Sequence, residues 1–298
     1  QGTASNNTRG MMAGGTPANN VVEFITMASL GDAIDFGNLT NAGVILNGGL
    51  ADTTRACFAG VNQNPGTNYN TYIDFFTIST TSNATDFGDL TVARYNCPGV
   101  ASSTRGVWQG GRKSPGANSN EVDFITISST GNAADFGDLT VSGMGFQNSQ
   151  CNSSTRGLFA GSNTPTNLDT IDYITIATIG NGTDFADLSV ARSQPGGLCS
   201  STRGLWFGGL ANPDSAAVNI IDFVTIATLG DAADFGNLTA VAQHPAGASS
   251  KTRGVIGGLE SASNVMQYVT IASSGDAIDF GDLTVSPIQL SGCSNGHG

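Results

Sequence analysis

The sequence predicts an all-β fold, a six-bladed β-propeller built from four-stranded blades, because two phrases alternate along the whole chain. A Thr-Arg-Gly phrase, which reads Thr-Arg-Ala in the second repeat, recurs six times, with its arginines at Arg9, Arg55, Arg105, Arg156, Arg203 and Arg253. An Asp-Phe pair follows each of them, with its aspartates at Asp35, Asp86, Asp135, Asp184, Asp234 and Asp279. Successive arginines lie 46, 50, 51, 47 and 50 residues apart. A repeated period near fifty is typical of repeat architectures, so residues 1–298 are expected to form one domain.

One repeat unit, residues 192–238, reads as four short strands joined by turns. The strands are expected within residues 194–199, 203–209, 220–227 and 234–241. The first is made of small residues and the second ends at the double glycine Gly208-Gly209. The third is rich in β-branched and aromatic side chains, which favour strands. No helical periodicity interrupts this pattern.

The central strands carry apolar side chains on both faces, as in residues 220–226 (IIDFVTI). A strand covered on one side only would alternate with polar residues. Each sheet is therefore expected to lie between two neighbours, as a blade does in a propeller. An open solenoid would need atypical capping repeats at its ends, and the six repeats show none.

The chain ends predict how the ring closes. The repeats fall near residues 1–46, 47–96, 97–147, 148–194, 195–243 and 244–286. Residues 287–298 resemble the segment that precedes each Thr-Arg-Gly phrase, with His297 at the arginine position. We expect this tail to supply the innermost strand of the blade that the N-terminus begins, because sharing one blade leaves no free sheet edge.

Composition excludes several classes of partner. The net charge is −12, and six of the 11 Lys and Arg residues are the repeated arginines. No basic stripe remains for nucleic acid, and no apolar run approaches the roughly 20 residues that span a bilayer. The five cysteines form no Cys-x-x-Cys pair, so we expect buried thiols and neither a disulfide framework nor a zinc site.

Spacing separates scaffold from variable surface. A central-strand position, acidic in five repeats (Glu23, Asp74, Asp123, Asp172, Asp222 and, as the exception, Gln267), lies 12 residues before every Asp-Phe aspartate. The distance from the arginine to that position varies between 14 and 19 residues. One loop per blade therefore varies, and all copies should emerge on one face, where recognition is commonly found. The most contact-capable side chains there are Tyr69, Tyr72, Arg112, Lys113 and Asp214; drifting solvent loops are the alternative.

The recurring arginines and aspartates have a structural interpretation. Because both occur once per repeat, we expect each Thr-Arg-Gly arginine to pair with an Asp-Phe aspartate of its own or the adjacent blade, locking blade to blade. The alternative is a ring of arginines that binds an anion.

Metal and catalytic sites are weakly supported. Oxygen-bearing sets spaced i, i+3, i+6 would suit calcium, but Asx-turns explain them without a metal; they are Asp32, Asp35 and Asn38, then Asp231, Asp234 and Asn237, then Asp276, Asp279 and Asp282. The only histidines, His244 and His297, stand in different repeats and form no recognisable triad. We therefore expect no cofactor, no metal and no enzyme activity.

Two resemblances extend this interpretation. The Gly-Gly strand end, the loop, the aromatic strand and the arginine at Arg192 resemble the Kelch repeat, with Gly14-Gly15 and Gly110-Gly111 at matching positions. Asp-Phe-Gly-Asp-Leu stands where a Kelch repeat has its tryptophan. The phrases Ile-Asp-Tyr-Ile-Thr-Ile and Asp-Phe-x-Asp-Leu are similar to repeats in virion and tail proteins of tailed bacteriophages.

Together these features predict a non-enzymatic binding or assembly module, located outside a cell or in a virion. The first expectation is a phage tail or fibre module that contacts a host surface glycan or a neighbouring virion protein. A subunit of an extracellular filament or adhesin, with homo-oligomeric packing, is the second. A propeller enzyme acting on glycans is the third.

Overall fold

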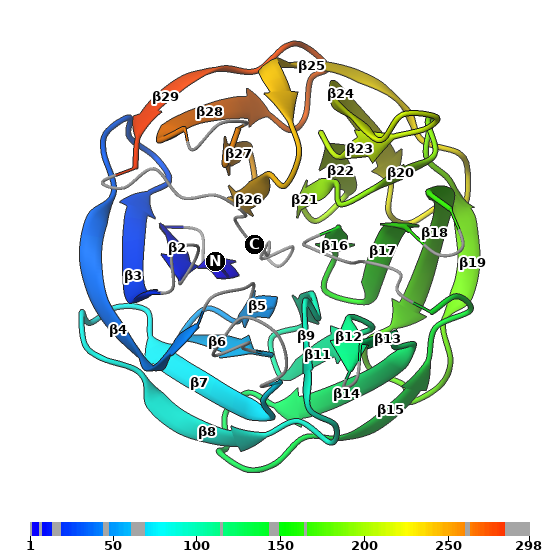
Figure 1. Cartoon of the computed structure of the whole chain (residues 1–298). Helices are drawn as coiled ribbons and strands as arrows, with labels where there is room; N and C mark the ends of the chain where they lie inside the picture. The colour runs from blue at the N-terminus through cyan, green and yellow to red at the C-terminus, as the bar shows by residue number, and fades with distance from the viewer. Residues whose placement is uncertain are drawn as a thin grey trace.

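The computed structural model describes residues 2–5, 8–13, 19–43, 48–60, 69–113, 116–142, 149–163, 166–259 and 263–283. In this part of the chain the fold is all-β, with six antiparallel sheets that each contain four principal strands in chain order. Figure 1 shows these sheets following one another in chain order around a common centre. The all-β prediction is therefore confirmed, and the predicted order of four strands per repeat is seen in each sheet.

The first three sheets contain β1 (Gly2–Ser5), β2 (Arg9–Ala13), β3 (Asn19–Thr26) and β4 (Ile34–Gly43); β5 (Gly48–Ala51), β6 (Arg55–Ala59), β7 (Tyr72–Thr77) and β8 (Thr85–Asp89); and β10 (Gly99–Ala101), β11 (Arg105–Gln109), β14 (Glu121–Thr126) and β15 (Ala134–Asp138).

The next three contain β16 (Gln150–Asn152), β17 (Arg156–Ser162), β18 (Leu168–Thr175) and β19 (Thr183–Asp187); β21 (Gly196–Cys199), β22 (Arg203–Phe207), β24 (Ala216–Thr225) and β25 (Ala233–Ala242); and β26 (Ala246–Ser249), β27 (Arg253–Gly257), β28 (Val265–Thr270) and β29 (Ile278–Asp282).

Short accessory strands extend two of the connections. β9 (Arg94–Tyr95), β12 (Arg112–Lys113) and β13 (Ala117–Asn118) form a small sheet beside the third principal sheet. β20 (Arg192–Ser193) and β23 (Leu210–Ala211) add to β24 in the fifth.

The innermost strands meet at the centre in a closed series. β1 contacts β5, and the contacts continue from β5 to β10, β16, β21 and β26, which in turn contacts β1. Small residues make this approach possible. A Cβ on Gly48 would lie 1.6 Å from the carbonyl oxygen of Cys97, and one on Gly197 would lie 2.3 Å from that of Gln150. Glycine is the residue that tolerates such close backbones.

The first sheet corrects one prediction. Its innermost strand is β1, which pairs with β2 in the register Gly2↔Ala13 to Ser5↔Gly10. The place assigned to the C-terminal tail is thus filled by the N-terminal residues of the same repeat. The small residues of β1 (GTAS) match those of β5 (GGLA) and β26 (AGAS), a similarity that explains this pairing. Residues 287–298 lie outside the described residues.

Apolar packing joins every sheet to the next. One buried cluster spans the first and second sheets through Phe36, Phe58 and Phe76, and equivalent clusters fill each following interface. The cluster of Met12, Ile25, Val255 and Phe280 closes the series between the sixth and first sheets. Because both faces of each sheet are buried, the central strands carry apolar side chains at odd and even positions alike.

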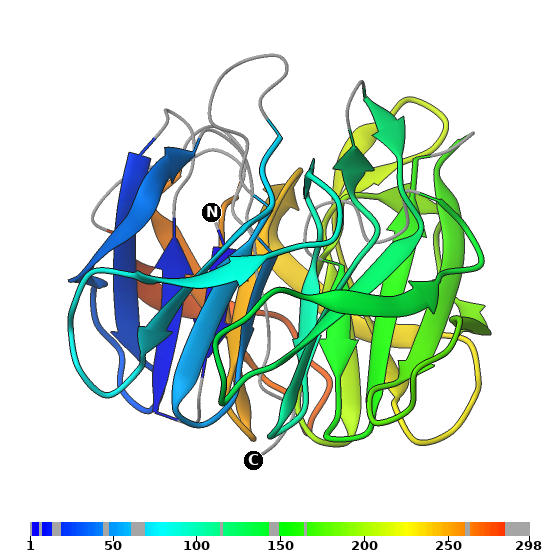
Figure 2. The same cartoon turned by 90° about the horizontal axis from the view of Figure 1, so that it is seen from below.

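Connections leave the sheets at two opposite ends, as Figure 2 shows from the side. Because the strands are antiparallel, the six Thr-Arg-Gly turns and the six outer hairpins share one end, which we call the turn face. The second strand of each sheet ends, and the third begins, at the other end, which we call the loop face. Figure 1 places β9, β12 and β13 together in one sector of the ring.

Candidate binding site on the loop face

An aromatic stack and an arginine meet on the loop face between the second and third sheets. The rings of Tyr69 and Tyr95 stack with centroids 4.8 Å apart and planes 25° apart. Arg112 lies directly opposite Tyr95 in the pairing of β12 with β9. Burial raises the pKa of the Tyr95 phenol, and the charge of Arg112 opposes that rise. Tyr69 is half-buried, so part of the stack faces solvent.

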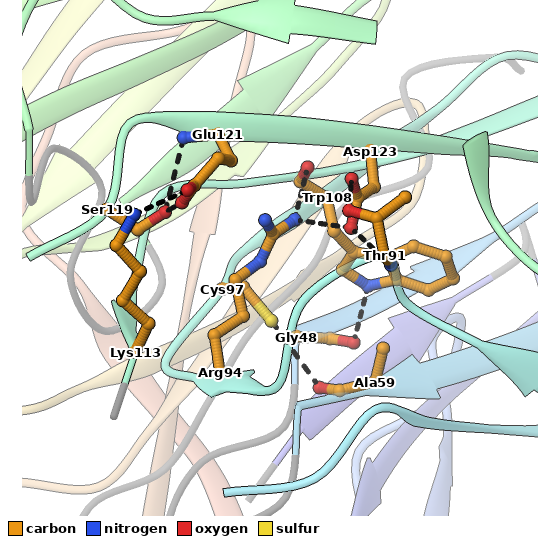
Figure 3. Close-up of polar contacts among 10 residues, drawn as sticks. All are labelled: Gly48, Ala59, Thr91, Arg94, Cys97, Trp108, Lys113, Ser119, Glu121 and Asp123. Carbon is orange, nitrogen blue, oxygen red and sulfur yellow. Dashed lines mark hydrogen bonds and ion pairs between the residues drawn. The ribbon is translucent and has the colours of Figure 1, made fainter. Parts of the chain in front are cut away.

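The β12–β13 hairpin fixes the two basic residues of this site. Arg112 donates from Nε and Nη2 to the carbonyl oxygen of Gly116, at 3.2 and 3.1 Å. Lys113 pairs with Glu121, with Nζ 2.5 Å from Oε1, and both side chains are part-exposed. Ser119 bonds the second carboxylate oxygen of Glu121, as Figure 3 shows. The hairpin is therefore tied to the start of β14.

A buried ion pair holds β9, the strand that carries Tyr95. Arg94, which precedes Tyr95 in β9, is fully buried, and its Nη2 lies 3.1 Å from Oδ2 of Asp123. The same nitrogen donates to the carbonyl oxygen of Trp108 at 3.2 Å. Figure 3 shows Asp123 held in turn by Thr91. A charged side chain is rarely buried without such a partner, so β9 is held firmly.

Sequence reasoning missed Arg94. The signal was available, because Ala-Arg follows the last strand in only two repeats, at Arg94 and Arg192. Arg192 repeats the arrangement between the fourth and fifth sheets, 2.9 Å from Asp222 and 3.2 Å from the carbonyl oxygen of Trp206.

The predicted site residues do not all come together. Tyr69, Arg112 and Lys113 belong to the cluster around Tyr95. Tyr72 starts β7 opposite Asp89 and lies in a separate surface hollow with Thr40 of the first sheet. Asp214 is exposed in the turn between β23 and β24, in the fifth sheet. The candidate site is therefore the Tyr69–Tyr95–Arg112 cluster, with Lys113 and Glu121 at its edge.

The Thr-Arg-Gly arginines join neighbouring sheets through backbone carbonyls. Arg105 donates from Nη1 to the carbonyl oxygen of Ile176 in the next sheet at 2.9 Å, and its guanidinium lies 4.6 Å from the ring centroid of Phe124. The others repeat the carbonyl contact, Arg9 with Ile78, Arg55 with Ile127, Arg156 with Ile226, Arg203 with Ile271 and Arg253 with Met27. Each also stacks on an aromatic ring of its own sheet.

The prediction of ion pairs with the Asp-Phe aspartates is therefore wrong for Arg55, Arg105, Arg156, Arg203 and Arg253. Within the described residues the ion pairs are Arg94–Asp123, Lys113–Glu121 and Arg192–Asp222. The aspartates Asp35, Asp86, Asp135, Asp184, Asp234 and Asp279 are exposed on the outermost strands. An aromatic ring and a carbonyl oxygen occupy the surroundings of each guanidinium, so the carboxylates remain in water.

The buried carboxylates lie on the central strands. Asp172 accepts hydrogen bonds from N and Oγ1 of Thr140 in the preceding sheet, at 2.9 and 2.8 Å. Thr40 bonds Asp74, Thr91 bonds Asp123, Ser189 bonds Asp222, and Thr239 bonds Gln267 in the same way. Burial raises the pKa of Asp74 and Asp172, and the threonine hydrogen bonds oppose this rise.

The oxygen-bearing turn sets link sheets to one another. Oδ1 of Asp32 accepts from the backbone N–H of Asp282, that of Asp231 from Asp187, and that of Asp276 from Asn237. In the described ranges no group of three or more His, Cys, Asp or Glu side chains is placed to hold a metal ion. The same ranges contain no helix long and apolar enough to cross a membrane.

The described cysteines and His244 are buried. Cys57, Cys97, Cys151 and Cys199 are free thiols without exposed surface, as predicted. His244 is buried, and desolvation lowers its pKa to about 4. Cys293 and His297 lie outside the described residues.

Comparisons with known proteins add no family. No protein-family model matches this chain, and no curated protein matches it.

Proposed function

We propose that the chain is a six-bladed, Kelch-like β-propeller without enzyme activity, and that it binds a surface through the Tyr69–Tyr95–Arg112 cluster. Support for the propeller comes from the closed series of inner strands and from the interface clusters between consecutive sheets. Support for the binding role comes from the aromatic stack, in which Tyr69 belongs to a loop of variable length and Tyr95 to β9, in the connection to the third sheet. Such loops commonly carry recognition.

The chemistry of the cluster suits a glycan. The solvent-facing part of the half-buried Tyr69 ring can pack against the apolar side of a sugar ring, while its hydroxyl offers a polar contact. A guanidinium supplies several donors in a fixed plane for hydroxyl or carboxylate oxygens. The Gly116 carbonyl and the β9–β12 pairing hold Arg112 in advance, which lowers the entropy cost of binding.

The phrasing of the repeats is similar to that of phage virion proteins, so we propose a phage tail or fibre module as the setting. Its partner is then a host surface glycan or a neighbouring virion protein. Tyrosine and arginine are also enriched at the energetic centres of protein interfaces.

A glycan array probed with the labelled full chain tests this proposal. Tyr69→Ala and Arg112→Ala should each lose the signals that the unmodified chain gives. Tyr72→Ala is the matched control, because it removes a tyrosine from a different hollow and should leave the signals unchanged. Signals that survive both site substitutions would remove this cluster as the binding site.

Exposed aliphatic side chains favour a second candidate, a subunit of an extracellular filament. Leu30, Ile179 and Leu229 occupy the same outer-hairpin position in three repeats and are 61%, 56% and 62% exposed. Exposed apolar groups gathered on one end of a protein are typical of interaction surfaces. A contact between the turn face of one copy and the loop face of the next is head-to-tail. Such a contact does not close into a ring of subunits and therefore builds an open filament. The variant that combines Leu30→Thr, Ile179→Thr and Leu229→Thr tests this candidate by sedimentation. A filament subunit should lose its large assemblies in this variant, whereas equal sedimentation of the variant and the unmodified chain would contradict it.

A further inference from the structure

A pocket of about 480 Å³ opens on the turn face where the sixth sheet meets the first. The first sheet supplies Met27 and Ala28, and the sixth supplies the turn from Ser250 to Arg253. Figure 1 shows these two sheets side by side, although they are the ends of the described chain. A volume in this range is typical of small-molecule sites, which occupy ~300–1,000 Å³.

Two departures from the repeat coincide in this pocket. Lys251 stands where the other repeats have uncharged residues, namely Asn7, Thr53, Ser103, Ser154 and Ser201. Met27 stands where the others have Ile78, Ile127, Ile176, Ile226 and Ile271. The equivalent pocket between the fourth and fifth sheets has Ser154 and Ile226 at these positions and measures about 320 Å³. The pocket between the sixth and first sheets is therefore larger than the one between the fourth and fifth, and Lys251 adds a positive charge that the other pocket lacks.

The two cationic side chains of the pocket come from one turn, where Ser250 Oγ accepts the backbone N–H groups of Thr252 and Arg253. Arg253 is held over the ring of Tyr268, 4.7 Å from its centroid, and its Nη1 reaches the carbonyl oxygen of Met27 at 3.4 Å. The other arginines make this bond at 2.8 to 3.2 Å. Among the described residues, Lys251 is exposed and makes no ion pair. None of the described residues that line the pocket carries a carboxylate.

We propose that this pocket binds an organic oxyanion, carried as a carboxylate or as a sulfate ester, between Lys251 and Arg253. A guanidinium and an ammonium on one wall provide charge-assisted hydrogen bonds to such a group. Met27 and Ala28 form an apolar wall for the rest of the ligand. Because the chain carries a net charge of −12, an anion needs a local pair of cations to approach it. This site is on the opposite face from the Tyr69–Tyr95–Arg112 cluster and does not depend on its function.

Saturation-transfer NMR and calorimetry with three probes test the proposal on the full chain. D-glucuronate carries a carboxylate, glucose 6-sulfate carries a sulfate ester, and glucose is neutral. We expect at least one acid to bind and glucose not to bind, and the identity of the acid distinguishes the two sources. Lys251→Ser should weaken binding about tenfold or more, as expected for loss of one charge-assisted hydrogen bond. Lys251→Arg should retain it.

The controls exclude folding and general charge effects. Serine is the residue present at positions 103, 154 and 201 of the same fold, so Lys251→Ser should melt like the unmodified chain. Lys113→Ser removes one lysine from the loop face and should bind the acid normally. Failure of both acids to bind, equal binding by Lys251→Ser, or an equal loss in Lys113→Ser would each overturn the proposal.

Discussion

Nη1 of Arg253 reaches the carbonyl oxygen of Met27, a residue 226 positions earlier in the chain, at 3.4 Å. This contact repeats between the last and first sheets the bond that joins every other pair of neighbours. The backbone N–H of Ala33 also donates to the carbonyl oxygen of Asp282, at 3.3 Å. The two ends of the described chain are therefore joined by the same chemistry as its middle, and no shared sheet is needed to close the ring.

The threonine–carboxylate contacts between sheets predict a local stability effect. Thr140→Val removes the hydroxyl that bonds Asp172 and leaves a buried carboxylate short of a donor. We expect unfolding in urea to require about 1–3 kcal/mol less free energy, the usual cost of such a loss. Thr183→Val is the control, because Thr183 is exposed on β19, in the sheet that carries Asp172. Equal stability of the two variants would show that the contact contributes nothing.

The buried pair of Arg192 and Asp222 predicts strong coupling. Arg192→Met alone strands a carboxylate in the interior and should cost about 3–5 kcal/mol. Adding Asp222→Leu removes the stranded charge, so the double variant should be more stable than either single variant. A double-mutant cycle from denaturant unfolding measures this coupling. Additive losses would mean that the two side chains act independently.

The strand order could be predicted from the sequence, because the same phrases recur in each repeat and the central strands carry apolar side chains on both faces. It also located the variable loops, of which the Arg112 hairpin became part of the candidate site. It did not locate the partners of the arginines. Every residue has a backbone carbonyl oxygen, so a hydrogen bond to one cannot be recognised from residue types. Equal numbers of Arg and Asp suggested a pairing, whereas each arginine contacts a carbonyl oxygen and an aromatic ring, and the aspartates are exposed on the outermost strands. Tyr95 and Arg94 were missed because β9 lies in a connection.

His244 predicts how stability depends on pH. Its folded pKa of about 4 lies below the ordinary value of 6.5, so the unfolded chain takes up a proton first on acidification. The resulting stabilisation is complete above pH 6.5 and is lost as pH falls toward 4, by up to about 3 kcal/mol. Compared with His244→Gln, the native chain should lose stability across this window. Parallel pH curves for the two proteins would contradict the prediction.

The inner strand β1 predicts that the N-terminal residues are required. Deleting residues 1–5 uncovers the edge of β2 and removes the contacts with β5 and β26. We expect a lower melting temperature and a tendency to aggregate, because an open sheet edge pairs with other chains. Light scattering and calorimetry measure both effects. An unchanged melting temperature and a monodisperse deletion variant would exclude β1 as a structural strand.

Closure of the ring is the claim on which the pocket between the sixth and first sheets depends, and a cross-link tests it most directly. Cysteines at positions 28 and 251 line one pocket, although 223 residues separate them. In a Cys293→Ser background, a short bismaleimide should join them in native protein and not in urea, as measured by intact mass after partial proteolysis. Cysteines at 154 and 227 occupy the equivalent pocket between adjacent sheets and serve as the positive control. Linkage of both pairs is the predicted result, whereas linkage of the 154–227 pair alone would contradict a closed ring.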